Sequence, residues 1–578
     1  MSKLNIKING MDYSVESGTT ILDACRENGI RIPTLCYLKN VNQIGACRVC
    51  VCEVKGARSL VAACVYPIER EGTEIFTNSP KVIKSRKTTV ELLLSNHNNS
   101  CNSCVRSTNC ELQALAQELG CDENAYHGVK NTYEEDVTPY LIRDNSKCIL
   151  CRRCVAVCKN LQHVAVIGVN HRGFRTDVGS AYERSLNDVP CLACGQCINV
   201  CPTGALREKD DIDEVAAAIA DPSKHVVVAT APAVRVAIGE EFGYPIGTNV
   251  EGKMVTALKM LGFDKVFDVN FAADVTIMEE GTELLNRIKN KGVLPMLTSC
   301  SPGWINYIEQ YYPELLPHLS TAKSPQAMYG ALVKSYYAEA NNIDPKDIFV
   351  VSIMPCTAKK LERRRPNLGR DGIQDIDAVL TTRELARFIK RSGILFKCLK
   401  DSHYDPFMGE GSTAGLIFGT TGGVMEAALR TVKEVVEGKE LEKIEFDDVR
   451  GTQGVKRATV NIGGKDIKVA VAHGIENADV IMKEIKNGTA DYTFVEIMCC
   501  PGGCVNGGGQ PLQPADVRNN IDIRTERAKA MYNTDSKAVL RKSHENPEVK
   551  ALYANWLGEP NGHKAHELLH TTYYNRKK

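Results

Sequence analysis

Cysteine is the residue type with the clearest capacity for chemistry in this sequence. The 578-residue chain holds 24 cysteines, and 18 of them lie before residue 202. In a small secreted domain such a number would indicate disulfides, but in a long chain without an export signal it is typical of metal ligands. The first residues, MSKLNIKING, alternate in polarity and form no apolar signal core, so we expect a cytoplasmic protein.

Two cysteine runs between residues 148 and 201 repeat one spacing, C-x2-C-x2-C-x3-C. This spacing is typical of two-cluster bacterial ferredoxins, in which the fourth cysteine of each run ligates the other cluster. We therefore predict two 4Fe-4S clusters here. One takes Cys148, Cys151, Cys154 and Cys201, and the other takes Cys191, Cys194, Cys197 and Cys158.

A first cysteine group, spaced C-x10-C-x2-C-x13-C, precedes these runs. Thiolates on the loops of a small β domain suit a 2Fe-2S cluster, because soft iron prefers sulfur. The closely spaced central pair could chelate one iron, and a zinc site is the alternative. The ligands would be Cys36, Cys47, Cys50 and Cys64.

A second group is spaced H-x3-C-x2-C-x5-C and is similar to histidine-ligated 4Fe-4S sites. A neutral imidazole in place of a thiolate makes a cluster less negative, which raises its potential. Zinc bound by three cysteines and a histidine is the competing interpretation. The ligands would be His97, Cys101, Cys104 and Cys110. The cysteines that fit no spacing, which we expect to be small buried hydrophobes, are Cys25, Cys52, Cys121 and Cys398.

Beyond residue 210 most of the remaining cysteines lie in three loops rich in glycine or proline. These loops are 298–304 (TSCSPGW), 354–362 (MPCTAKKLE) and 496–509 (EIMCCPGGCVNGGG). In open α/β sheets, ligands gather at the carboxyl ends of strands. The sequence therefore predicts that the three loops converge on one buried metal site.

The elements that must position these loops can be predicted from apolar patterns. Near the N-terminus, alternation around Asn9-Gly10 predicts a β-hairpin, and Thr19 or Thr20 could cap a helix that ends near Gly29. Helical stretches separate the later strand candidates, which indicates a doubly wound α/β arrangement. These candidates are residues 226–229, 266–269, 348–353, 469–472 and 494–497.

The three loops resemble the signature loops of FeFe hydrogenases, and the order of clusters before them is similar to the monomeric clostridial type with four accessory clusters. The resemblance covers essentially the whole chain. It implies a multidomain α/β and α+β protein, with ferredoxin-like N-terminal domains and a large two-lobed α/β hydrogenase domain. The expected domains are residues 1–80 (2Fe-2S, β-grasp), 81–125 (histidine-ligated 4Fe-4S), 126–210 (two 4Fe-4S clusters), 211–525 (catalytic) and 526–578 (a small helical tail).

The resemblance also implies a catalytic cofactor, a 4Fe-4S cube bridged to a two-iron unit that carries CO, cyanide and a dithiolate amine. Cys356 and Cys500 would ligate the cube, and Cys504 would bridge the two parts. Lys359 would hydrogen-bond a cyanide, and this anion would compensate the buried charge. Residues that match those packed around the two-iron unit, each of which alone would be ordinary core, are Pro232, Pro325, Gln326, Met354, Phe418 and Met498.

One position departs from the family pattern, which usually reads TSCCP where this chain has Cys300-Ser301. In the family the first cysteine shuttles protons and the second ligates the cube. Serine is a poor iron ligand, because its hydroxyl loses a proton at far higher cost than a thiol. Three alternatives remain open: Ser301 binds as an alkoxide, Cys300 moves into the ligand role, or the neighbouring Cys499 substitutes.

A proton route is predicted toward Cys300. Glu280, Glu283 and Arg287 lie at helical spacing, and Ser320 falls at the family's relay position. Carboxylates and hydroxyls within hydrogen-bond reach pass protons stepwise. Taken singly, each carboxylate would be an ordinary solvated helix face, so the resemblance is what favours the route.

Two further motifs match known functional patterns, but their surroundings in the sequence do not support those functions. Residues 566–570 (HELLH) fit the zinc-protease pattern H-E-x-x-H, but they lie in a short charged tail without an evident third ligand. The run Gly507-Gly508-Gly509 lacks the strand and helix that flank a nucleotide-binding loop.

The expected activity is reversible reduction of protons to H2 with electrons from ferredoxin, in a monomer whose two-iron unit is supplied by maturation proteins. A net charge of +1 and the lack of a long apolar run give no reason to expect nucleic-acid or membrane partners. One alternative is a subunit of an NAD-linked electron-bifurcating hydrogenase. Another is a non-catalytic relay subunit like that of complex I, which lacks the three loops. A hydrogen sensor is a third, although no appended signalling domain is visible.

Overall fold

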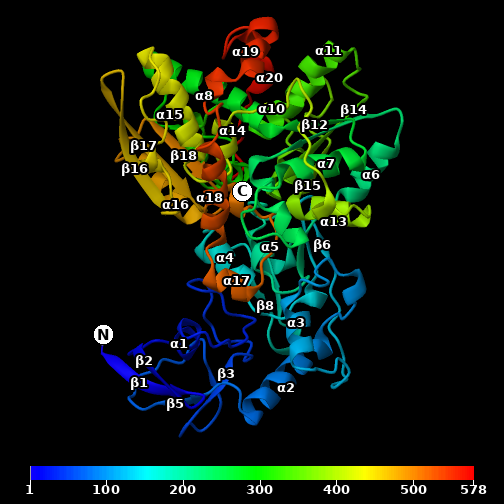
Figure 1. The fold of residues 1–578 in the computed structure, drawn as a ribbon, viewed down its shortest axis with the longest axis vertical. Helices are drawn as coiled ribbons and strands as arrows, with labels where there is room; N and C mark the ends of the chain where they lie inside the picture. Colours follow the sequence, from blue (N-terminus) through cyan, green and yellow to red (C-terminus); the bar gives the residue numbers. More distant parts are fainter. Residues whose placement is uncertain (1, 578) are drawn as a thin grey trace.

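The computed structural model describes residues 2–577. The N-terminal domains, drawn in blue and cyan in Figure 1, lie below a large domain drawn in green to red. Among the described residues, no helix has both the length and the apolar character needed to cross a membrane.

The first domain is a five-stranded sheet of order β2-β1-β5-β3-β4 with one helix. The predicted hairpin is confirmed, and Asn9 and Gly10 both adopt the positive φ that its tight turn requires. The helix begins after Thr20, whose hydroxyl caps it by accepting the N–H of Asp23. The elements are β1 (Lys3–Ile8), β2 (Met11–Glu16), α1 (Ile21–Glu27), β3 (Val51–Val54), β4 (Val61–Ala62) and β5 (Glu74–Phe76).

The next segments hold the remaining N-terminal cysteines. Two helices flank the histidine group, and a small sheet of order β10-β7-β6 supports the two repeated runs. These elements are α2 (Pro80–Asn96), α3 (Glu111–Glu118), β6 (Asp136–Val137), β7 (Leu141–Arg143), α4 (Arg153–Asn160), β8 (Gly168–Asn170), β9 (Asp177–Gly179), α5 (Gln196–Val200) and β10 (Leu206–Glu208).

The large domain contains two four-stranded sheets, and all five predicted strands are confirmed. They divide between the sheets instead of forming one. The first sheet, of order β12-β11-β14-β15, is parallel throughout, and in the second, of order β13-β18-β17-β16, only β16 is antiparallel. The strands are β11 (His225–Thr230), β12 (Lys265–Asp268), β13 (Met296–Leu297), β14 (Ile348–Met354), β15 (Ala378–Thr381), β16 (Val455–Ile462), β17 (Lys465–His473) and β18 (Phe494–Met498).

Helices cover both sheets and fill the space between them (Figure 1). The 21-residue helix α8 is buried along most of its length and contributes apolar side chains to the cores of both lobes. The helices are α6 (Ile212–Ala220), α7 (Glu251–Leu261), α8 (Val269–Lys289), α9 (Pro302–Tyr311), α10 (Pro325–Leu332), α11 (Ala338–Asn341), α12 (Ala358–Glu362), α13 (Thr382–Arg391), α14 (Thr413–Ile417), α15 (Gly423–Glu437) and α16 (Ile475–Lys486).

The C-terminal segment connects distant parts of the molecule. Its helix α17 reaches the N-terminal domains, where Arg518 donates to Asn199 O and to a carboxylate oxygen of Glu111. Its last residues pair with the segment before α10, because the N–H of Thr571 donates to Thr321 O at 2.8 Å. The helices are α17 (Ala515–Asn520), α18 (Ile523–Asp535), α19 (Pro547–Leu552) and α20 (His563–Leu569).

The cysteines outside the spaced groups do not share one environment. Cys25 and Cys52 are buried as predicted, and burial raises the pKa of each thiol to about 12. Cys121 is half-buried. The prediction is wrong for Cys398, which is exposed at the end of a 3-10 turn.

Candidate active site

A cavity lies where carboxyl ends of strands from both sheets meet. The segments after β11 and β14 come from one lobe, and those after β13 and β18 come from the other. Because all four strands are parallel within their sheets, their ends face the same region. Every residue expected to hold or surround the catalytic cofactor lines this cavity: Pro232, Cys300, Ser301, Pro325, Gln326, Met354, Cys356, Lys359, Phe418, Met498, Cys500 and Cys504.

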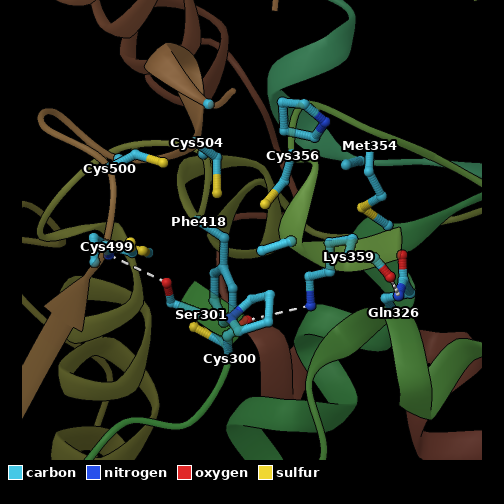
Figure 2. Close-up of a pocket in the computed structure, with 18 of the residues that line it drawn as sticks. Cys300, Ser301, Gln326, Met354, Cys356, Lys359, Phe418, Cys499, Cys500 and Cys504 are labelled. Carbon is cyan, nitrogen blue, oxygen red and sulfur yellow. Dashed lines mark hydrogen bonds between the residues drawn. The ribbon is translucent and has the colours of Figure 1, made fainter. Parts of the chain in front are cut away.

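The donor set of the cavity fits an iron–sulfur group. Figure 2 shows the thiols of Cys356, Cys500 and Cys504 pointing into the same space. Burial raises the pKa of the Cys504 thiol to about 12 and also raises that of Cys356. These thiols would therefore stay protonated unless a cation stabilised the thiolate, which bound iron does.

The three consecutive glycines, which do not fit a nucleotide-binding loop, have a packing role. A Cβ on Gly507 would lie 2.0 Å from Pro355 O, and one on Gly508 would lie 2.2 Å from Cys194 O. The run therefore closes the cavity by letting the third loop pass directly against the second loop and against the last cysteine run.

Lys359 is the cation of the cavity and is 8% exposed. Its Nζ donates to Glu362 Oε2 at 2.8 Å and to Cys300 O at 3.3 Å. Gln326 Nε2 and Ser324 Oγ donate to the same Glu362 oxygen, at 3.1 and 2.9 Å. A protein carboxylate therefore pairs with the lysine in addition to the ligand anion that was expected to do so. The i,i+3 spacing within α12 could have indicated this pair.

The residues of the predicted proton route lie together. Arg287 Nη2 donates to Glu283 Oε1 at 2.7 Å, and Ser320 Oγ donates to Glu283 Oε2 at 3.0 Å. Burial, reinforced by the charge of Glu283, raises the pKa of Glu280 to about 8. Ser320 also interacts with Glu280. Desolvation, together with the charge of Glu280, raises the pKa of the Cys300 thiol at the cavity. The row therefore runs from near the surface at Arg287 to the cavity.

The thiols of the two cysteine runs lie in two groups, and each group contains the fourth cysteine of the other run. Cys148, Cys151, Cys154 and Cys201 line one cavity. In the other group, Cys158 interacts with Cys191, Cys194 and Cys197. Left-handed residues recur at matching places in both runs, namely Leu150, Arg152, Ala193 and Gly195. Such turns direct backbone N–H groups at an anionic group, and Leu150 N donates to Cys148 Sγ at 3.4 Å.

The histidine group lies against the end of the second run. The N–H of Glu111, next to Cys110, donates to Pro202 O at 3.0 Å. His97 is 8% exposed, and its buried Nδ1 has no hydrogen-bond partner among residues 2–577. Burial lowers the pKa of His97 to about 4, so the ring is neutral. A buried neutral imidazole with an unpaired nitrogen suits a metal-bound histidine.

The closely spaced Cys47 and Cys50 were expected to bind one iron. In the structure their thiols instead lie next to two different cysteines of the group. Cys50 Sγ lies 3.4 Å from Cys64 Sγ, and Cys36 interacts with Cys47. The loop 47–50 therefore spreads its two thiols toward different partners from other parts of the domain.

A single amide links this group to the first ferredoxin-type group. Asn42 Nδ2 donates to Cys36 O at 2.7 Å and to Cys151 O at 3.1 Å. Asn42 is 4% exposed, so its amide group lies between the two sites. Nothing in the cysteine spacing marked this residue.

Comparison with known proteins agrees with this geometry. The family described as iron only hydrogenase large subunit, C-terminal domain, matches residues 224–508, and iron hydrogenase small subunit matches residues 521–576. Iron hydrogenase 1 of Clostridium pasteurianum is 47% identical over 98% of this chain and 99% of its own length. The chain belongs to the FeFe hydrogenase family.

Other matches cover every part of this hydrogenase. The NADP-reducing hydrogenase subunit HndD of Solidesulfovibrio fructosivorans is 46% identical over the full length of both chains. A solved structure of HydA1 from Chlamydomonas reinhardtii, 43% identical, covers 64% of this chain and 100% of its own with a TM-score of 0.58. The N-terminal matches are a 2Fe-2S cluster binding domain (1–80), an NADH-ubiquinone oxidoreductase-G iron-sulfur binding region (86–125) and a ferredoxin-like domain of NADH-quinone oxidoreductase subunit 3 (138–207).

The unusual pair Ser301 and Cys499 of this hydrogenase is in direct contact. The backbone N–H of Cys499 donates to Ser301 Oγ at 3.2 Å (Figure 2). The Cys499 thiol interacts with the thiols of Cys194 and Cys500. It therefore lies where the last cysteine run meets the active-site cavity. Sequence spacing could not show this contact, because Cys194 and Cys499 are far apart in the chain.

Proposed function

We propose that this hydrogenase catalyses the reversible reduction of protons to H2 with electrons from ferredoxin. The observation that carries the proposal is one buried cavity that combines thiols from three loops, a single paired lysine and the inner end of a proton route. The accessory groups would be one 2Fe-2S and three 4Fe-4S clusters, held by the four cysteine and histidine groups described above.

Some of the cavity residues would bind the cofactor directly, and the others would form an apolar shell around it. Cys356, Cys500 and Cys504, with Ser301 at the fourth position, would hold the cube, and Cys504 would also contact the two-iron unit. When bound, that unit supplies the redox-active iron at which H2 is interconverted with protons and electrons. Apolar shell residues exclude water, and exclusion of water strengthens each polar contact inside. This shell consists of Pro232, Pro325, Met354, Phe418 and Met498.

Lys359 would bind an anionic ligand of the two-iron unit. Glu362 directs the ammonium group into the cavity, since it accepts from Nζ at 2.8 Å while Ser324 and Gln326 hold the carboxylate in place. A preorganised charge of this kind binds without reorganisation at the moment of reaction.

Protons would reach the cavity through Arg287, Glu283, Ser320, Glu280 and Cys300. The raised pKa of Glu280, about 8, favours a carboxyl that still carries a proton near neutral pH. Such a group can both give and receive a proton under working conditions. Cys300 would be the last donor before the reacting centre.

Electrons would arrive through the cysteine groups in the order set by their contacts. The 2Fe-2S group meets the Cys148 group through Asn42, and the histidine group meets the same region through Pro202. The second run continues the series, because Cys194 lines the active-site cavity itself. Electrons could therefore start at either outer group and converge before the active site.

A second candidate is a subunit of an NAD(P)-linked electron-bifurcating hydrogenase. The full-length similarity to an NADP-reducing hydrogenase subunit favours this alternative specifically. The active site would be the same, and only the partner that exchanges electrons with the outer clusters would differ.

The test is anaerobic infrared spectroscopy and H2 assay of protein coexpressed with hydrogenase maturation proteins. We expect CO and cyanide bands and H2 evolution from reduced viologen. Cys504→Ala is the matched control, which should lose the bands and keep the accessory iron. Absence of both bands and H2 in the wild-type protein would refute the proposal. Rates with reduced ferredoxin and with NADPH plus copurifying flavoproteins then separate the two candidates.

A further inference from the structure

The C-terminal H-E-x-x-H motif, which fits the pattern of a zinc site, has a structural role in this protein. Glu567 points outward, and its carboxylate lies 3.5 Å from Arg370 Nη1. His566 is exposed, and its ring stacks on that of His570 at a centroid distance of 4.6 Å. His570 itself is buried, with 2% of its side chain exposed. The motif therefore places one imidazole in the interior.

Both ring nitrogens of His570 contact groups on other elements. Nε2 lies 3.0 Å from Glu279 Oε2 on α8, and Nδ1 lies 2.8 Å from Thr321 Oγ1. Backbone hydrogen bonds from Lys323 N to Leu569 O and from Thr571 N to Thr321 O, both 2.8 Å, fix the histidine between these partners.

Thr321 connects this histidine to the proton route. Its Oγ1 donates to Glu283 Oε2 at 3.2 Å, the oxygen that also accepts from Ser320 Oγ at 3.0 Å. Because the single hydroxyl proton of Thr321 is given to Glu283, its oxygen accepts from His570 Nδ1–H. A continuous line of exchangeable groups thus runs from Glu279 through His570 and Thr321 to Glu283.

Glu279 ends this line inside the protein. It is fully buried, and its oxygens accept from the Tyr553 hydroxyl and from the N–H of Asn561 at 2.7 Å. Glu279 and Glu283 lie one turn apart on α8, so the C-terminal segment bridges two carboxylates of the same helix. The titratable groups that surround His570 are Glu279 and Glu283 from α8, His566 from α20 and, behind Glu279, Tyr553.

We propose that His570 is a positioning residue of the proton route, which acts through Thr321 to orient the Glu283 carboxylate. The inference rests on the proposed function. The Nδ1–H of His570 is given to Thr321 Oγ1, so the threonine hydroxyl proton is directed at Glu283 and holds this carboxylate beside Ser320. Glu279 at Nε2 fixes the imidazole in this orientation, and no proton needs to leave the histidine.

The experiment compares His570→Gln and Thr321→Val with wild type in fully matured protein. Glutamine lacks the imidazole that contacts both Glu279 and Thr321, and valine keeps the shape of threonine without its hydroxyl. We expect H2 evolution from reduced viologen to fall about tenfold in each variant, with a larger solvent isotope effect and a shifted pH profile, because the Glu283 carboxylate loses an oriented hydrogen-bond donor. The double variant should lose no more than either single variant, because both interrupt one line.

The controls separate this inference from misfolding and from failure of the proposed function. His563→Gln lies on the same helix, exposed and outside the line, and should match wild type. Iron content and the CO and cyanide bands should be unchanged in all variants. A wild-type pH profile in loaded His570→Gln and Thr321→Val would overturn the inference, as would additive losses that leave the pH profile unchanged. Missing bands in wild type itself would instead contradict the proposed function.

Discussion

The backbone N–H of Cys499 donates to Ser301 Oγ across 3.2 Å, and this contact joins the position that departs from the family pattern to the cysteine that could substitute for it as a ligand. An N–H donor stabilises negative charge on the oxygen that accepts it, which lowers the cost of an alkoxide ligand. The Cys499 thiol, in contrast, lies among the thiols of Cys194 and Cys500. The arrangement favours Ser301 over Cys499 as the fourth ligand of the cube.

Substitution at the two positions tests that preference. We expect Ser301→Ala to lose the iron of the cube, about four atoms per chain. Ser301→Cys should retain it, and Cys499→Ala should match wild type. Iron and sulfide analysis with electron paramagnetic resonance of the reduced protein measures the outcome. Loss of the cube in Cys499→Ala but not in Ser301→Ala would assign the ligand role to the cysteine.

Replacement of Glu280 by glutamine should interrupt the proton route without disturbing its packing. We expect H2 evolution to fall by about two orders of magnitude or more, since the amide does not relay protons. In wild type the pKa of about 8 means that the carboxyl ionises as pH rises through that value, so its capacity to donate declines above it. A pH profile of the rate checks this, and Glu280→Asp should restore part of the activity.

The same pKa has a consequence for stability. Glu280 is neutral in the folded protein until pH approaches 8, whereas an unfolded glutamate ionises near 4.5. The folded state therefore loses stability relative to the unfolded state as pH rises from 4.5 through 8. Unfolding midpoints of wild type should decline more steeply over this window than those of Glu280→Gln. Parallel curves for the two proteins would contradict the assignment of a raised pKa.

We expect substitutions at the two members of the buried pair Lys359 and Glu362 to have different effects on stability. Glu362→Ala leaves an ammonium group without its partner, and we expect a destabilisation of about 3 kcal/mol or more. Lys359→Met removes the charge and keeps the volume, so the fold should be less affected while the two-iron unit fails to bind. Thermal unfolding reports the first effect, and infrared bands report the second. Full CO and cyanide bands in Lys359→Met would count against its proposed role.

Substitution of Asn42 should slow electron transfer from the 2Fe-2S cluster and leave the other electron route unchanged. Asn42→Leu removes the amide that contacts both Cys36 and Cys151 and fills its volume. We expect the 2Fe-2S cluster to be reduced normally but to pass electrons onward more slowly. Rapid-freeze electron paramagnetic resonance after a pulse of reductant measures this transfer. Unchanged transfer kinetics would show that the amide only supports packing.

Some expectations needed only short stretches of sequence. The strands, the hairpin at Asn9-Gly10 and the helix after Thr20 follow from local pattern, and each is confirmed because nothing in the tertiary structure opposes the local preference. The three loops were expected to converge because ligands gather at the carboxyl ends of strands in open α/β sheets, and the structure brings them together around one cavity.

The candidate iron ligands could be predicted from the amino-acid sequence, because ligand spacing within a run is a local property of the chain. How those residues meet depends on the tertiary structure. Cys50 pairs with Cys64 and not with its near neighbour, Asn42 bridges two groups, and His570 reaches Thr321 across 249 positions. Such contacts depend on how separate segments pack against one another, and no spacing along the chain encodes that packing.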